Sequence, residues 1–177
     1  GGGAEYTLEP ARRPITIRHL LTHSSGLPSE ADFPYWNGPN FRFPTREEMI
    51  EKLKTQRTVY PAQTHLAYSN LGMAILGQIV RERSEQEYRA YIQANILDTL
   101  GLSLTRPYYP KDLLGDELAI GYSGFGRSGT RTPLGPFMAR AITPAGGFTS
   151  SGVALAKFAS WQFRLLAKGG NEVLGVN

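Results

Sequence analysis

No stretch of the 177 residues alternates apolar and polar side chains in the way that a half-buried β-strand requires. Runs of β-branched and aromatic residues, which are typical of strands, are also missing. Several segments instead carry apolar residues at helical spacing, and long stretches rich in glycine and proline separate them. The sequence therefore predicts a mainly α-helical fold with long loops and few strands.

Five segments are predicted to be helical from their caps and from the spacing of their apolar residues. Thr45 and Glu48 have the spacing of a capping box. Thr16 can cap a shorter helix, in which Ile17, Leu20 and Leu21 would form an apolar stripe. The five segments are residues 16–25, 45–56, 69–83, 85–97 and 150–168.

The composition fits one globular domain. Hydrophobic residues make up 41% and charged residues 19%, which is enough apolar material for a packed core. We expect residues 1–177 to form a single unit, with a loop-like segment over residues 1–14. The net charge of +4 is spread along the chain, so no nucleic-acid surface is predicted. No apolar run reaches the ~18 residues of a membrane span.

No metal ion or cofactor is predicted. Cysteine is absent, which excludes disulfides, thiolate nucleophiles and thiolate metal ligands. His19 and His23 have the spacing of a zinc-binding HExxH helix, but Leu20 replaces its glutamate and no third ligand is nearby. His23 is better placed to bond the loop backbone at the helix end. The glycines of GYSGFGRSG match neither phosphate-binding pattern.

The segment HLAYSNLGMAILGQIV allows two interpretations of its polar residues. Ser69 or Asn70 is a good N-cap for a helix that starts near Leu71, which would make the triplet YSN purely structural. Alternatively, the polar groups border a ligand site at the helix N-terminus. Gly72 and Gly77 weaken this helix by about 1 kcal/mol each relative to alanine, so a close packing partner is expected.

The loop SEADFPYWNGPNFRFP is unusually long and aromatic. Loops of this kind are commonly functional or wrapped on a surface. Its five aromatic residues form a candidate ligand or partner surface, and they are Phe33, Tyr35, Trp36, Phe41 and Phe43.

Three segments together resemble one family. ITIRHLLTHSSGLP (15–28), YSNLGMAILGQIV (68–80) and PAGGFTSSGVALAKF (144–158) follow in this order. They are similar to the serine β-lactamase-like group, which comprises class C β-lactamases, D-alanyl-D-alanine carboxypeptidases and related esterases. The resemblance implies the helical subdomain of the β-lactamase and penicillin-binding-protein α/β fold.

The resemblance also implies acyl transfer through a covalent serine intermediate. Carried onto this chain, Tyr68 of the Tyr-x-Asn motif would be the catalytic general acid and base, assisted by a lysine. Asn70 would bind the substrate and that lysine, and Ser69 would remain the helix cap. β-Lactams, peptidoglycan-type peptides and simple esters are all substrates of this group, and the sequence does not select among them.

The chain departs from the family pattern at two motifs. No serine is followed by lysine three positions later, so SxxK is absent. The KTG or HxG motif is absent as well, because Lys168-Gly169-Gly170 reads as a helix end. The expectation is therefore a central fragment of a serine hydrolase that is inactive by itself. Its surface would associate with the missing α/β domain or with another chain.

An alternative interpretation is a binding or scaffold module that kept the helical subdomain and lost the chemistry. An upstream SxxK and a downstream KTG or HxG in the parent reading frame would favour the enzyme. The cellular compartment stays undetermined, although a periplasmic or secreted location fits the family.

Overall fold

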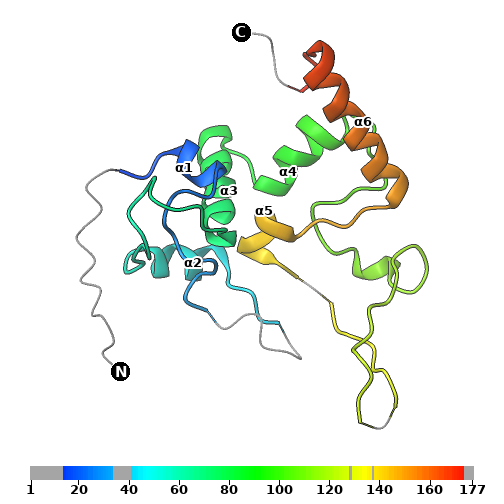
Figure 1. The fold of residues 1–177 in the computed structure, drawn as a ribbon. Helices are drawn as coiled ribbons and strands as arrows, with labels where there is room; N and C mark the ends of the chain where they lie inside the picture. Colours follow the sequence, from blue (N-terminus) through cyan, green and yellow to red (C-terminus); the bar gives the residue numbers. More distant parts are fainter. Residues whose placement is uncertain (1–13, 34–40, 128, 137, 174–177) are drawn as a thin grey trace.

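The computed structural model describes residues 14–33, 41–127, 129–136 and 138–173. This part of the chain is rich in helix (Figure 1). The longer helices are α1 (Ile17–Leu21), α2 (Arg46–Leu53), α3 (Asn70–Ser84), α4 (Tyr88–Ile92) and α6 (Gly152–Lys168). β-Structure in the described residues is limited to isolated bridges, such as Arg106 with Thr149. The prediction of a mainly helical chain with few strands is confirmed.

Side-chain caps begin the helices where the sequence predicts them. The Thr45 hydroxyl accepts a bond from the Glu48 amide at 3.2 Å, and the Glu48 carboxylate accepts one from the Thr45 amide at 2.9 Å. This pair is the predicted capping box. Thr16 caps α1, Ser69 caps α3 and Ser151 caps α6 in the same way, each accepting from a backbone amide of the first turn.

Helix α3 lies at the centre of the main hydrophobic core. Leu71 and Ala74 of α3 are fully buried, and α1 and α5 (Thr143–Gly146) pack against this helix (Figure 1). Leu20 of α1 joins the core, but the side chains of Ile17 and Leu21 are 53% and 59% exposed. The predicted three-residue stripe is therefore wrong, because a five-residue helix places only one side on α3.

The described aromatic residues of the 29–44 loop belong to the core. Phe43 is 1% exposed, and Phe33 and Phe41 are partly buried against the same cluster. A ligand or partner surface is therefore the wrong prediction for Phe43, whereas Phe33 and Phe41 contribute part of their surface to the core. Tyr35 and Trp36 lie outside the described residues, as does the expected loop over residues 1–13.

A second, smaller core cluster forms around α4. Ile92, Leu97 and Leu102 are buried there, with Tyr88 and Tyr91 packed against them. The predicted helix over 85–97 is interrupted, because α4 ends at Ile92 and a π-helical turn (Gln93–Leu97) continues the segment. The segment nonetheless buries one side, which carries Tyr88, Tyr91, Ile92 and Leu97.

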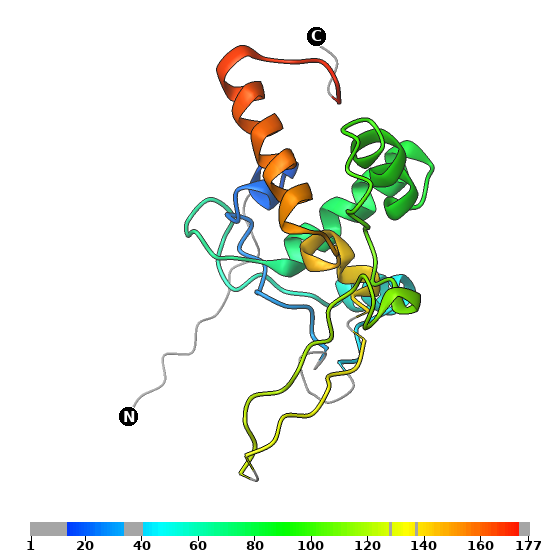
Figure 2. The ribbon, with the colours of Figure 1, turned by 90° about the vertical axis from the view of Figure 1, so that its right-hand side faces the viewer.

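The region between α4 and α6 is largely irregular, as predicted. It contains the 3₁₀ turns Lys111–Leu113 and Arg140–Ile142 (η3) and the short helix α5. Residues 120–127 and 129–135 extend from the rest of the molecule, and α6 extends in the opposite direction (Figure 2). Four apolar side chains of α6 are more than half exposed, namely Val153, Leu155, Phe163 and Leu166. No helix in the described residues is long and apolar enough to cross a bilayer.

Gly77 lets α3 and α5 approach each other closely. A Cβ atom at this position would lie 2.1 Å from Cγ of Pro144. The proline ring cannot rotate away, so the helices would have to separate. Gly72 is different, because its Cβ would meet only ordinary contacts, at 3.5 Å from the Ser69 side chain. The packing partner predicted from the two glycines therefore exists at Gly77 alone.

Gly77→Ala is expected to lower the free energy of unfolding by about 1–3 kcal/mol, because overpacking forces the backbone to shift. The measurement is urea unfolding followed by circular dichroism at the helical band.

Gly72→Ala is the matched control on the same helix. It is expected to raise the free energy of unfolding by about 0.5–1 kcal/mol, since alanine is the better helix former and fits without a clash. Equal effects of the two substitutions would contradict the close approach of α3 and α5.

Candidate functional site

Helix α1 ends in a way that aims the following loop at α3. The amide of Ser24 donates to the carbonyl of His19 at 2.9 Å, and the amide of His23 donates to that of Leu20 at 3.3 Å. These two bonds form a Schellman motif, in which the residue after the cap has a positive φ. Here it is His23, with φ 52°, in a position where glycine is more usual.

The loop over residues 23–30, called the 23–30 loop below, is bound to residues 59–70 along its length. The carbonyls of His23, Ser24 and Gly26 accept bonds from the amides of Ala67, Gln63 and Val59, at 2.7–2.9 Å. Gly26 has φ 74°, and a Cβ there would lie 1.9 Å from the carbonyl oxygen of Tyr60. No other residue fits this contact, because both the positive φ and the lack of space exclude a side chain.

Ser69 joins the 23–30 loop to the start of α3. Its hydroxyl accepts a bond from the Gly72 amide at 2.9 Å and donates to the Pro28 carbonyl at 2.6 Å. Its own amide donates to Nδ1 of His23 at 3.2 Å. With 1% of its surface exposed, Ser69 is a buried cap. The contacts of Ser69 are therefore those of a helix cap, which is the role predicted for the middle residue of YSN.

Tyr68 and Asn70 flank this cap and are bonded to each other. The Tyr68 hydroxyl donates to Oδ1 of Asn70 at 2.8 Å, and Nδ2 of Asn70 donates to Oε1 of Glu30 at 2.6 Å. The Tyr68 side chain is 59% exposed, whereas Asn70 is partly buried. The backbone amide of Asn70 is also fixed, because it donates to the Ser29 carbonyl at 2.8 Å.

The Glu30 carboxylate decides the direction of these bonds. An ionised carboxylate can only accept, so the end of the Asn70 amide that faces it must be the NH₂ group. Oδ1 then faces Tyr68, and the tyrosine must be the donor. The chain of bonds from Tyr68 through Asn70 to Glu30 therefore holds the asparagine in one orientation, with its oxygen toward the phenol.

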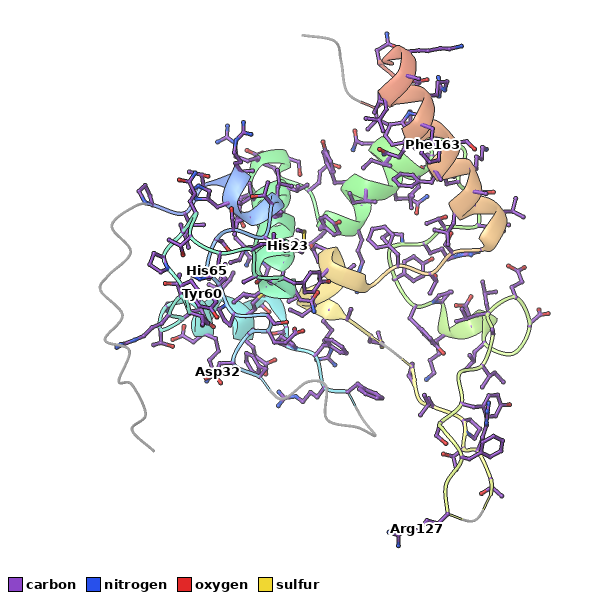
Figure 3. The ribbon with its side chains drawn as sticks, in the orientation of Figure 1. His23, Asp32, Tyr60, His65, Arg127 and Phe163 are labelled. Carbon is purple, nitrogen blue, oxygen red and sulfur yellow. The ribbon has the colours of Figure 1, made fainter. Side chains whose placement is uncertain are left out.

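The two histidines of HLLTH have separate structural roles. Nδ1 of His19, a buried residue, accepts from the Thr16 amide at 3.1 Å and so completes the cap of α1. The His23 ring lies 4.7 Å from the Tyr68 ring, centroid to centroid, and Nδ1 of His23 accepts from the Ser69 amide. His23 lies beside α3 in Figure 3. The predicted bond of the His23 side chain to the loop at the end of its own helix is therefore wrong, because the ring nitrogen accepts from Ser69, 46 residues further along the chain.

No metal site emerges from these residues. The described part of the chain contains no group of three or more histidine, cysteine, aspartate or glutamate side chains that could hold a metal ion. His19 and His23 both use Nδ1 to accept from the backbone.

Sequence reasoning selected Tyr68, Ser69 and Asn70 and missed Glu30 and Ser29. Glu30 lies 40 residues before Asn70, at the end of GLPSE, and no periodicity connects the two. The contact could have been suspected because HLLTHSSGLP and YSN both belong to the family resemblance, and two motifs that occur together are expected to lie close in space.

The helix-rich scaffold with long loops, in which the 23–30 loop packs on the start of α3, fits the class that the sequence resembles. That class comprises the β-lactamases and penicillin-binding proteins. The Beta-lactamase family profile matches residues 4–175, and the chain belongs to this family.

Curated relatives agree with this assignment. The chain is 32% identical over 111 residues to "Beta-lactamase-like protein 2" of Dictyostelium discoideum. It is 33% identical over 92 residues to the D-alanyl-D-alanine-carboxypeptidase/endopeptidase AmpH of Escherichia coli. The matches cover 62% and 52% of this chain but only 20% and 24% of those proteins. The chain thus corresponds to less than a quarter of their length.

Solved structures give the same fold. The octameric penicillin-binding protein homologue from Pyrococcus abyssi matches with a TM-score of 0.74 at 29% identity, over 95% of this chain and 38% of that one. A class C β-lactamase matches with a TM-score of 0.67 at 20% identity, over 90% and 40%. A D-amino acid amidase from Ochrobactrum anthropi matches with a TM-score of 0.68 at 21% identity, over 90% and 44%.

Ser69→Ala is expected to lower the free energy of unfolding by about 2–3 kcal/mol. The loss of the cap accounts for about 1 kcal/mol, and the partly buried Pro28 carbonyl, left unpaired, accounts for the rest. Urea unfolding of the 177-residue chain measures the change.

Ser151→Ala, which removes the cap of α6, is the control. Ser151 bonds one amide, that of Ala154 at 3.1 Å, so its loss is expected to cost about 1 kcal/mol. If Ser69→Ala lowered the free energy of unfolding no more than Ser151→Ala does, the bond between Ser69 and Pro28 would not contribute to stability.

Proposed function

We propose that Tyr68 and Asn70 are the Tyr-x-Asn pair of a serine acyl-transfer site. The observation that carries this proposal is the 2.8 Å bond between the Tyr68 hydroxyl and Oδ1 of Asn70, beside the buried cap of α3. The exposed Tyr68 side chain can be reached by a substrate, whereas Ser69 cannot serve as a nucleophile because it is buried and bonded on both sides. The substrates are β-lactams, D-alanyl-D-alanine peptides or esters, the classes on which this family acts.

In this function, Tyr68 transfers a proton at the reacting oxygen or nitrogen. The attacking serine loses its proton as its oxygen bonds the substrate carbonyl, and the leaving group later takes a proton up. Asn70 offers its amide to the substrate. The 23–30 loop fixes the backbone of Asn70 and Glu30 fixes its side chain, so the group is oriented before the substrate arrives.

We further propose that residues 1–177 act as one helical subdomain of the β-lactamase-like α/β fold. The nucleophilic serine and its lysine would come from residues outside this segment, because SxxK is absent within it. The exposed apolar side chains of α6, including Phe163 (Figure 3), favour a packing partner for this helix. Burial of these side chains against the remaining domain would stabilise both parts.

The test uses the longer protein that contains this chain. Acyl-enzyme formation and turnover are measured with a chromogenic cephalosporin, a D-alanyl-D-alanine peptide and a short-chain nitrophenyl ester. Tyr68→Phe is expected to lower kcat/KM by about 100- to 10,000-fold, since general acid–base catalysis contributes that much. Asn70→Ala is expected to weaken both acylation and substrate binding.

Tyr60→Phe is the matched control. Tyr60 is also partly exposed, and its ring stacks on His65 at 4.3 Å between centroids (Figure 3). This substitution is expected to leave kcat/KM unchanged. Full activity of Tyr68→Phe would show that Tyr68 does not transfer the proton. Complete inactivity of the unmutated longer protein on all three substrates would favour a binding module instead.

The 177-residue chain by itself is expected to give no turnover, because it holds no serine with lysine three positions later. Turnover by the purified chain that Tyr68→Phe abolishes would contradict a nucleophile from outside these residues.

A further inference from the structure

A pocket lies along the C-terminal half of α3, whereas Asn70 stands at the N-terminus of this helix. Its volume is about 400 Å³, which is in the range of small-molecule sites. It is formed by the beginning of α2, the C-terminal half of α3, the beginning of α4, and η3 with α5. These elements pack around α3 (Figure 1). Neither Tyr68 nor Asn70 lines this pocket.

Four arginines and one glutamate line this pocket. They are Arg46, Arg81, Arg89, Arg140 and Glu87. Two of the arginines are neutralised by carboxylates, since Arg46 pairs with Glu82 at 2.6 Å and Arg81 pairs with Glu87 at 2.5 Å.

The other two arginines carry uncompensated charge. Neither Arg89 nor Arg140 has a carboxylate partner within 4.0 Å in the described part of the chain. Two positive charges on one wall of a pocket repel each other and attract an anion. The excess of two charges matches a dianion.

Arg89 is held in place before any ligand binds. Its Nη2 donates to the Thr143 hydroxyl at 3.2 Å, and this hydroxyl donates to the Arg140 carbonyl at 2.7 Å. Thr143 is 2% exposed, so this support is buried. Because the hydroxyl takes one bond from Arg89, the remaining N–H groups of the guanidinium stay available for an oxygen ligand. Arg140 has φ 46°, an unfavourable conformation for a residue with a side chain.

The rest of the lining is apolar or aromatic. Ala141 and Pro144 form part of it, together with the ring of Tyr88. Burial raises the pKa of Tyr88, so its phenol is neutral near pH 7 and does not repel an anion. A ligand that fills the pocket therefore combines an anionic group with an apolar or ring-shaped body.

We propose that this pocket binds a phosphomonoester, with its phosphate on Arg89 and Arg140 and its organic group against Tyr88 and Pro144. Guanidinium groups bind phosphate oxygens through two parallel charge-assisted bonds, which favours phosphate over a single carboxylate. The site is independent of the acyl-transfer function, because it uses other residues, at the other end of α3.

The test is isothermal titration of the 177-residue chain at constant ionic strength, with phenyl phosphate, inorganic phosphate and benzoate as probes. Phenyl phosphate is expected to bind with one-to-one stoichiometry, more tightly than inorganic phosphate, and benzoate is expected to bind weakest. Arg89→Gln is expected to weaken phenyl phosphate binding at least about tenfold, since each bond to a charged group contributes strongly. The affinity of Arg89→Lys for phenyl phosphate is expected to lie between those of the unmutated chain and of Arg89→Gln. Lysine keeps the positive charge but cannot form two parallel bonds to the phosphate.

Arg83→Gln is the matched control. It removes the same charge from the exposed surface of α3, outside the pocket, and is expected to leave the affinity nearly unchanged. Circular dichroism of each variant verifies the fold. If Arg89→Gln does not fold, the exposed Arg140→Gln replaces it, with the same loss of affinity expected.

Three results would overturn the proposal. The first is the absence of saturable phenyl phosphate binding in the millimolar range. The second is equal weakening by the pocket variants and by Arg83→Gln, which would show that only the general surface charge attracts the phosphate. The third is binding of benzoate as tight as that of phenyl phosphate, which would exclude a phosphate-specific site.

Discussion

The docking of the 23–30 loop on residues 59–70 is the contact on which the site depends. Its backbone bonds connect segments some 40 residues apart, and they place Glu30 against Asn70 and Pro28 against Ser69. Gly26 makes the contact possible, since any side chain there would collide with the Tyr60 carbonyl. Without this docking, α3 would lose its connection to Pro28 at the cap, and Asn70 would lose the carboxylate that orients it.

The two ends of the buried helix α3 carry chemically different groups. Its N-terminus carries the exposed Tyr68 and the oriented Asn70, and its C-terminal half carries Gln78 and Arg81 on the wall of the arginine pocket. Between them, Gly77 lets Pro144 of α5 approach within a distance that no side chain would allow. The same close packing that buries α3 therefore brings η3 and α5, with Arg140, to the pocket.

Local signals predicted the starts of α1, α2, α3 and α6, whereas α4, which has no side-chain cap, begins at Tyr88 instead of near residue 85. The capping box of Thr45 and Glu48 and the caps at Ser69 and Ser151 need only residues within one turn, so the sequence contains the whole cause. The other errors concern contacts between distant segments. Apolar spacing placed Ile17 and Leu21 inside, but whether they are buried depends on how α1 lies on α3. Phe43 was predicted to lie on the surface because loop residues usually do, yet it belongs to the same core cluster as Met49 of α2 and Leu71 of α3.

The sequence by itself determined the helical class, the caps and the choice of Tyr68 and Asn70, because periodicity, capping and motif resemblance are all properties of short segments. Only the tertiary structure decided how these groups interact. Asn70 lies between Tyr68 and Glu30, and four arginines converge on one pocket from four elements. The physical reason is that hydrogen bonds and charges act over a few ångströms in space, and only the packing of α3 against its neighbours brings these side chains within that range.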